Sequence, residues 1–171
     1  HGSIMKDAIS NMKNRIILGA MLSILINANS QMYTTALGFR ADASTLDVAL
    51  AEISVKTFFS EKNAFEINLG AGRYFLWSQL LFHSNNALKK DIEWYWGAGV
   101  DGGYWFTGSH SGGGKIDQDG GWLGLDGVLG IEYTFNYIPI NLAMDMGPTF
   151  RVIPAYKLGW MLGFTIRYGF R

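Results

Sequence analysis

The chain has 171 residues, of which 49% are hydrophobic and 15% aromatic, with 22 glycines and no cysteine. This length suits one domain, and the lack of cysteine excludes disulfides, thiolate metal sites and cysteine nucleophiles. Fourteen basic residues balance fourteen acidic ones, so the composition gives no electrostatic footprint for nucleic-acid binding.

The first thirty residues have the three-part pattern of a secretory signal peptide. Residues 1–4 are interpreted as a reading-frame remnant. Lys13 and Arg15 precede an apolar run over residues 16–26, and small residues at 28–30 offer a signal peptidase site. That run is too short to span a bilayer, which needs about twenty residues. We therefore expect residues 1–30 to be removed and residues 31–171 to form the folded domain.

Beyond Gln31, apolar and small or polar residues alternate with a period of two, which is the signal of β-strands. Eight strands are predicted, at about 33–41, 48–59, 64–73, 74–83, 92–106, 121–135, 139–152 and 156–170. The phase of the fourth segment is ambiguous, because Ser78 interrupts its best apolar register. The last segment is the clearest, with a large apolar residue at every second position: Leu158, Trp160, Leu162, Phe164, Ile166, Tyr168 and Phe170.

The connections differ in length. Residues 60–63 and 136–137 are predicted to form the tight turns that hairpins require, whereas residues 107–120 form a long, glycine-rich loop. Short periplasmic turns and longer external loops are typical of small outer-membrane barrels, and both termini would then be periplasmic. Pro148 interrupts a predicted strand, where we expect a bulge or the fraying outer end of that strand.

The volume of the barrel interior decides which of the two alternating residue classes faces inward. An eight-stranded barrel has an interior just wide enough for its own side chains or one small ligand, so the bulky class must face outward and glycine inward. This disfavours a soluble lipocalin-like carrier and predicts an all-β, eight-stranded antiparallel up-and-down transmembrane β-barrel. The predicted lipid-facing aromatic residues are Trp94, Trp96, Tyr133, Trp160, Phe164, Tyr168 and Phe170. All but Trp160 and Phe164 are near strand ends, as expected of interfacial girdles.

Charges of both signs belong to the inward class. Because buried charges need partners, we expect an ionic network that plugs the lumen and leaves no continuous water channel, rather than a catalytic carboxylate cluster. The predicted members are Arg40, Glu52, Lys56, Glu66, Glu93, Asp101, Asp126, Glu132, Asp145, Arg151 and Arg167.

Other polar motifs do not form a site. His83 and Ser84 are predicted to lie in a periplasmic turn, where adjacent residues rarely give a nucleophile an oriented base. His110 is interpreted as a solvated loop residue. The sequence at 117–121 matches only a fragment of a calcium loop, which needs further ligands, and no helix follows the glycines at 112–114 to bind a phosphate. We predict no catalytic, cofactor-binding or metal-binding residues.

From about Leu37 to the end, the chain resembles small eight-stranded outer-membrane barrels of the OmpA/OmpX type. The resemblance lies in the layout, in segments such as EISVKTFFSEKNAFEINLGAG and GLDGVLGIEYTFNYIPINLAMDMGPTF, and in the ending FTIRYGF. A terminal strand that closes on Phe170 is similar to the signal read by the barrel-assembly machinery, although Arg171 follows it here. The resemblance implies residence in the outer membrane of a Gram-negative bacterium, in contact with membrane lipid.

The resemblance is specific for architecture but not for activity. The first hypothesis is a non-enzymatic integral membrane protein with a structural role, or with an adhesive role through a surface partner of loop 107–120. The alternatives are an outer-membrane barrel enzyme that modifies lipid and a narrow pore for small solutes. A barrel enzyme needs a polar catalytic set at the bilayer rim, and the crowded charged lumen argues against a pore.

Overall fold

The computed structural model describes residues 33–46, 50–72, 75–106, 110–111, 114–115 and 120–170. The predicted signal peptide over residues 1–30 lies outside these residues. In the part of the chain that is described, no helix is long and apolar enough to cross a membrane.

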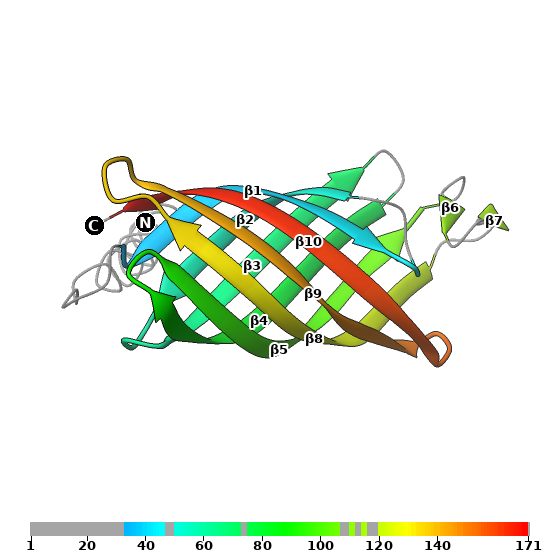
Figure 1. The fold of residues 1–171 in the computed structure, drawn as a ribbon. Coiled ribbons are helices and arrows are strands. Elements are labelled where there is room, and N and C mark those ends of the chain that lie inside the picture. The colour runs from blue at the N-terminus through cyan, green and yellow to red at the C-terminus, as the bar shows by residue number, and fades with distance from the viewer. Residues whose placement is uncertain are drawn as a thin grey trace, which may run out of the picture. The chain divides into compact units, whose positions relative to one another are not determined.

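Eight strands close into one antiparallel barrel (Figure 1), in the order β1-β10-β9-β8-β5-β4-β3-β2. Two further short strands pair only with each other in a separate sheet. The barrel strands are β1 (Thr35–Ser44), β2 (Leu50–Phe58), β3 (Asn63–Gly72), β4 (Phe75–Lys89), β5 (Ile92–Trp105), β8 (Gly120–Thr134), β9 (Ile140–Ile153) and β10 (Lys157–Phe170), and the separate pair is β6 (His110–Ser111) and β7 (Gly114–Lys115). The predicted fold class is confirmed.

The first and last strands close the barrel. β1 pairs with β10 along its whole length, from Thr35 opposite Phe170 to Ser44 opposite Met161. We call the end at Thr35 and Phe170 the terminal end and the opposite end the loop end. Closure leaves no unpaired sheet edge, which is what hydrocarbon demands of a spanning sheet.

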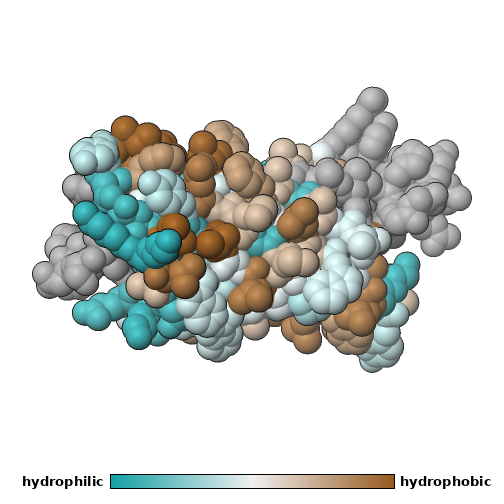
Figure 2. Space-filling model, viewed as in Figure 1, coloured by the Kyte–Doolittle hydropathy of each residue, from teal (hydrophilic) through white to brown (hydrophobic). Residues whose placement is uncertain are grey.

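The two faces of the wall differ in chemistry. In β10, exposed and buried residues alternate strictly from Leu158 to Phe170. The exposed ones are bulky and apolar, such as Trp160 at 57% and Phe164 at 52% exposure. The buried ones include Thr165 and Arg167, at 0% and 1%. Apolar side chains accordingly spread over the visible wall (Figure 2), and polar groups are enclosed.

The prediction for the fourth strand was wrong at its end. β4 continues to Lys89, six residues beyond the expected 83, and pairs with β5 as far as Ile92. Consequently His83 and Ser84 lie in the strand, and His83 is completely buried in the lumen. Ser84, Asn85 and Asn86 are residue types that favour turns, and here the two flanking strands override that preference.

The bulge expected at Pro148 was also misplaced. β9 keeps its register with β10 through Pro148, which lies opposite Trp160. On the other side of β9, Gly127 and Val128 of β8 have no pairing partner, because a proline offers no N–H to the ladder. The irregularity of this strand pair lies instead at Leu123 and Gly124.

The asymmetry of the connections holds only in part. At the loop end, fourteen residues separate β5 from β8, but only two separate β3 from β4 and three separate β9 from β10. β6 and β7 pair within the long connection. The barrel therefore has one extended loop rather than a crown of them.

Candidate functional site

The enclosed lumen is the candidate site, and a bidentate ion pair lies at its centre. Arg40 of β1 donates from Nη1 and Nη2 to the two carboxylate oxygens of Asp145 of β9, at 2.8 and 2.7 Å. Tyr95 donates its hydroxyl to the same carboxylate at 2.7 Å. The Arg40 and Asp145 side chains are both fully buried. Such charge-assisted, fork-shaped pairs are the strongest hydrogen bonds available to side chains, and this one joins strands that are not neighbours in the sheet.

Glu66 of β3 joins a second arginine to the first. Its Oε1 lies 2.6 Å from Nη2 of Arg167 and 3.7 Å from Nη1 of Arg40. Ser54 bridges the pair, accepting from Nε of Arg167 at 3.0 Å and donating to Glu66 at 3.1 Å. His83 stacks on Tyr95 with ring centroids 4.6 Å apart, and its Nδ1 is 3.6 Å from Glu66. The centre of the lumen is thus one connected network.

A third pair closes the terminal end. Lys56 donates to Glu132 at 2.7 Å, and Asn85 donates to Glu132 at 2.7 Å and to Glu93 at 2.8 Å. Tyr33, just before β1, donates to Glu132 at 3.4 Å. Burial, together with the neighbouring Glu132 carboxylate, raises the pKa of Tyr33 above that of an ordinary phenol, so this hydroxyl remains a donor.

Aromatic rings and an arginine fill the loop end. Trp105 and Trp122 stack with centroids 4.1 Å apart, and the Arg151 guanidinium lies 4.9 and 5.3 Å from their rings. The Trp122 indole donates to Asp101 at 2.9 Å. A guanidinium within about 6 Å of an aromatic face is attracted by its quadrupole, so the two indole rings stabilise Arg151 at this end.

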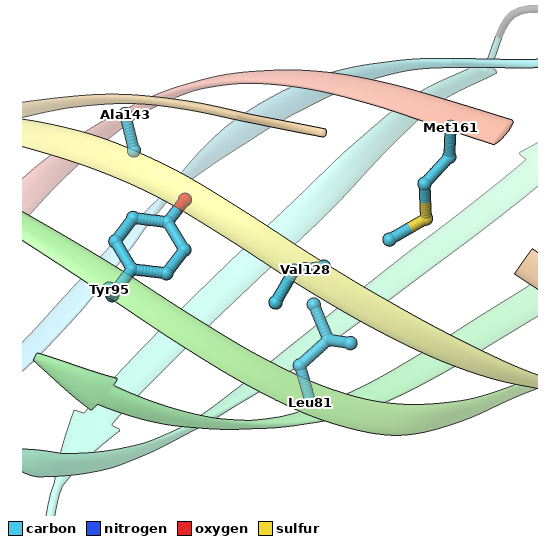
Figure 3. Close-up of a cluster of buried hydrophobic side chains, with 5 residues drawn as sticks. All are labelled: Leu81, Tyr95, Val128, Ala143 and Met161. Atoms are coloured by element: carbon cyan, nitrogen blue, oxygen red, sulfur yellow. The ribbon is translucent and has the colours of Figure 1, made fainter. Parts of the chain in front are cut away.

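A small apolar cluster lies inside the barrel and includes Tyr95 of the central network (Figure 3). It consists of Leu81, Tyr95, Val128, Ala143 and Met161, all buried. Gln79 lies beside it and donates to Asp126 at 2.7 Å.

Glycine makes room for the large groups of the lumen. A Cβ on Gly163 would lie 1.9 Å from Nη2 of Arg40, and one on Gly130 would lie 2.4 Å from the Tyr95 ring. Both distances are far inside van der Waals contact. The guanidinium and the phenol therefore reach Asp145 of β9 by lying over the neighbouring strands β10 and β8, which carry glycine at these positions.

No protein family model matches the chain, and no curated protein matches it. The chain is, however, similar to a solved structure, the N-terminal β-barrel domain of Pseudomonas aeruginosa OprF. The TM-score is 0.56 at 14% sequence identity, and the match covers 82% of this chain and all of that domain. The two share the fold of a closed eight-stranded antiparallel β-barrel. At this identity the likeness establishes the fold alone.

Within this barrel, the residues predicted for the lumen all project inward. Glu93 is half-buried at the terminal end, and the other ten are at most 7% exposed. The seven aromatic residues predicted to face lipid lie on the outer wall, between 37% exposure for Tyr133 and 57% for Trp160.

Sequence reasoning missed several members of the lumen. Asp42 shares the inward parity of Arg40 and contacts its Nε at 3.3 Å, but the predicted strand stopped at residue 41. His83, Gln79 and Asn85 lie on β4, whose phase was ambiguous and whose end was assigned to a turn. These residues could have been found by extending the predicted fourth strand until it paired with the whole of the fifth strand.

The part of the chain that the structure describes gives no sign of a metal or catalytic centre. No group of three His, Cys, Asp or Glu side chains within it is arranged to hold a metal ion. His83 has no hydrogen bond to either ring nitrogen. Ser84 lies on the half-exposed outer face of β4 and His83 on the lumen face, so these neighbours cannot act as a nucleophile and its base. His110 and the sequence at 117–121 lie mostly outside the side chains described.

A groove of about 720 Å³ indents the outer wall at the loop end of β2 to β5. Small residues such as Ala51, Ala71 and Gly102 form it, between bulky neighbours. Glu52 is the acid among its lining residues, and that side chain is fully buried. The surface of the groove is therefore mainly apolar.

Proposed function

We propose that this chain is a non-enzymatic integral protein of the outer membrane of a Gram-negative bacterium, with a lumen closed by its ionic network. Its role is structural, or adhesive through loop 107–120. The observation that carries the proposal is the contrast in chemistry between the two faces of the wall. The outer wall of a closed barrel is apolar and aromatic, whereas the buried lumen contains Arg40, Arg167 and their carboxylate partners.

The height of the apolar wall supports membrane insertion. On β5, exposed aromatic residues at Trp94 and Tyr104 bracket the outward-facing positions. Ten residues at about 3.3 Å each, inclined by about 40°, span about 25 Å along the barrel axis. This matches the apolar band of about 25 Å typical of outer-membrane barrels.

The geometry of the lumen supports a closed interior. An unpaired buried charge is strongly unfavourable, and the central charges are paired across the barrel instead of lining an open passage. The Lys56–Glu132 pair joins β2 to β8 and the Arg167–Glu66 pair joins β10 to β3, and each pair connects opposite sides of the barrel. The Arg40–Asp145 pair and the Arg151–tryptophan stack add buried side chains inside the wall, so we expect no steady conductance.

The adhesive role rests on the long connection between β5 and β8, because loops presented by a rigid scaffold carry function more often than the scaffold does. Replacing residues 107–119 by a four-residue turn should leave the barrel folded and abolish binding of cells or surfaces that the intact protein supports. Retention of that binding would leave the structural role alone.

Three measurements test the proposal as a whole. The purified protein should insert into lipid vesicles and migrate faster on a detergent gel before heating than after. Recordings in planar bilayers should show no steady current steps, and incubation with labelled lipid A should release and transfer no acyl chain. Steady steps would favour the narrow pore, altered lipid A would favour the enzyme, and failure to insert would refute membrane residence.

A further inference from the structure

We propose that the terminal end of the barrel binds the headgroup phosphate of anionic glycerophospholipids through three exposed lysines beside an aromatic patch. Lys62 lies in the turn between β2 and β3, and Lys89 and Lys90 lie at the tip of the β4–β5 hairpin. The inference rests on the proposed function, because it needs the barrel in a bilayer with this end at a headgroup layer.

The two lysine-bearing turns are neighbours. β3 pairs with β4 as far as Asn63 opposite Ser84, and the backbone N–H of Asn85 donates to the carbonyl of Lys62 at 2.6 Å. β4 then continues to Lys89 with β5 as its partner. The hairpin tip therefore projects beyond the β2–β3 turn on the same side of the barrel, and the lysines bracket one sector of the rim.

The three ammonium groups are available to an external partner. All three side chains are exposed, and among the described residues none of them forms an ion pair. The described acids nearby are Glu61, which is exposed, and Asp91 and Glu93, which are half-buried. Glu93 is on the lumen side and accepts a hydrogen bond from Asn85 at 2.8 Å. The exposed charge of this sector is thus positive.

The wall below the lysines is aromatic. Phe59, Phe65 and Phe82 form a cluster with ring centroids 4.8 to 6.1 Å apart. Trp94 and Trp96 follow on the outer face of the adjoining β5, at 39% and 50% exposure. Aromatic rings of this kind sit at the boundary between acyl chains and headgroups.

Each lysine lies just past the aromatic boundary of its own hairpin. Lys62 is three residues from Phe65 and Lys90 is four residues from Trp94. Lysine stems extend along apolar surface and carry the charge to the interface. The ammonium groups therefore reach the depth of lipid phosphates, and Figure 2 shows hydrophilic residues gathered directly beside apolar ones at this end.

An anionic phospholipid meets both halves of this surface. Its acyl chains cover the phenylalanine and tryptophan rings, and its phosphate and net negative charge meet the lysines. Free phosphate would engage only the lysines, and a zwitterionic lipid offers no net charge. Each lysine near an anionic membrane surface favours binding by about fivefold, with salt screening the effect.

The test measures lipid preference by quenching of tryptophan fluorescence. All proteins carry Trp160→Phe, so that the most exposed of the described outer-wall tryptophans, Trp94 and Trp96, lie at the terminal end. The full barrel is inserted into phosphatidylcholine vesicles with increasing brominated phosphatidylglycerol or brominated phosphatidylcholine. The test variant is Lys62→Gln/Lys89→Gln/Lys90→Gln, and the matched control is Lys157→Gln, an exposed lysine at the loop end.

The starting protein should prefer brominated phosphatidylglycerol severalfold, and added salt but not low inorganic phosphate should reduce the preference. The triple variant should lose it, and Lys157→Gln should keep it. A Lys89→Gln/Lys90→Gln variant, altered only at the hairpin tip, gives an intermediate preference and serves if the triple variant folds poorly. Equal quenching by the two lipids, or equal loss in the control, would overturn the inference. Failure of every protein to insert would instead refute the proposed function.

Discussion

The central ion pair gives the sharpest quantitative prediction. Asp145→Asn keeps the shape of the side chain but removes the charge that receives two hydrogen bonds from Arg40 and one from Tyr95. Removing one partner of a buried pair typically costs about 3–5 kcal/mol. Asp42 and Glu66 remain 3.3 and 3.7 Å from the guanidinium, so we expect a loss near the lower limit, about 3 kcal/mol.

The assay is urea unfolding of the vesicle-inserted barrel, with the free energy of unfolding extrapolated to zero denaturant. Glu61→Gln in the exposed β2–β3 turn serves as the control and should change stability by less than about 0.5 kcal/mol. A double variant, Arg40→Met/Asp145→Leu, should be destabilised at least as much as Asp145→Asn, because it also removes the cation that contacts Asp42 and Glu52. A loss below about 1 kcal/mol for Asp145→Asn would refute the view that this pair is a principal support of the lumen.

Three further substitutions test the outer face, the glycine wall and the loop end. Phe164→Arg places a charge at mid-strand on the outer face and should cost about 2–4 kcal/mol in vesicle unfolding, whereas a water-facing position would change by less than about 0.5 kcal/mol. Gly163→Val would drive its side chain into Arg40 and should cost at least about 1–3 kcal/mol; unchanged urea stability would show that the guanidinium moves aside easily. Trp122→Phe leaves Asp101 without its indole donor and should cost about 1–3 kcal/mol, and a neutral result would mean that water replaces that bond.

The strands were predictable because lipid on one side and a narrow lumen on the other impose one parity on every segment. β10 shows this most clearly, with exposed bulky apolar residues on even numbers and, on odd numbers from 159, glycine, Thr165, Arg167 and the buried Met161. The fourth strand was not predictable to its end, because the local preference of Ser84, Asn85 and Asn86 for turns opposes the pairing offered by β5. Whether these residues form a turn or extend the strand depends on pairing between strands in the closed barrel, which a local sequence pattern does not encode.

The membership of the lumen was largely readable from parity, but its pairings were not. Arg40 and Asp145 are 105 residues apart, and their meeting depends on the stagger of strands around the barrel, which alternation does not encode. The volume argument was also incomplete, since Trp77, Tyr95 and Trp122 lie inside. Trp122 fits because it covers Gly103, where a Cβ would lie 2.2 Å from the indole.

The charged lumen also explains how the strands find a single register. A slip of one residue moves every side chain to the opposite face. Such a slip would turn Arg40 and Asp42 of β1 toward lipid, or Asp145 and Arg151 of β9. The free-energy cost is up to about 2–4 kcal/mol for a basic residue at mid-bilayer and less for an acidic one. The slip would also force Phe39 or Phe150 into a lumen already filled at those levels. The ionic network therefore selects the register as well as closing the interior, because polar groups inside and bulky apolar groups outside penalise the same slip from opposite sides of the wall.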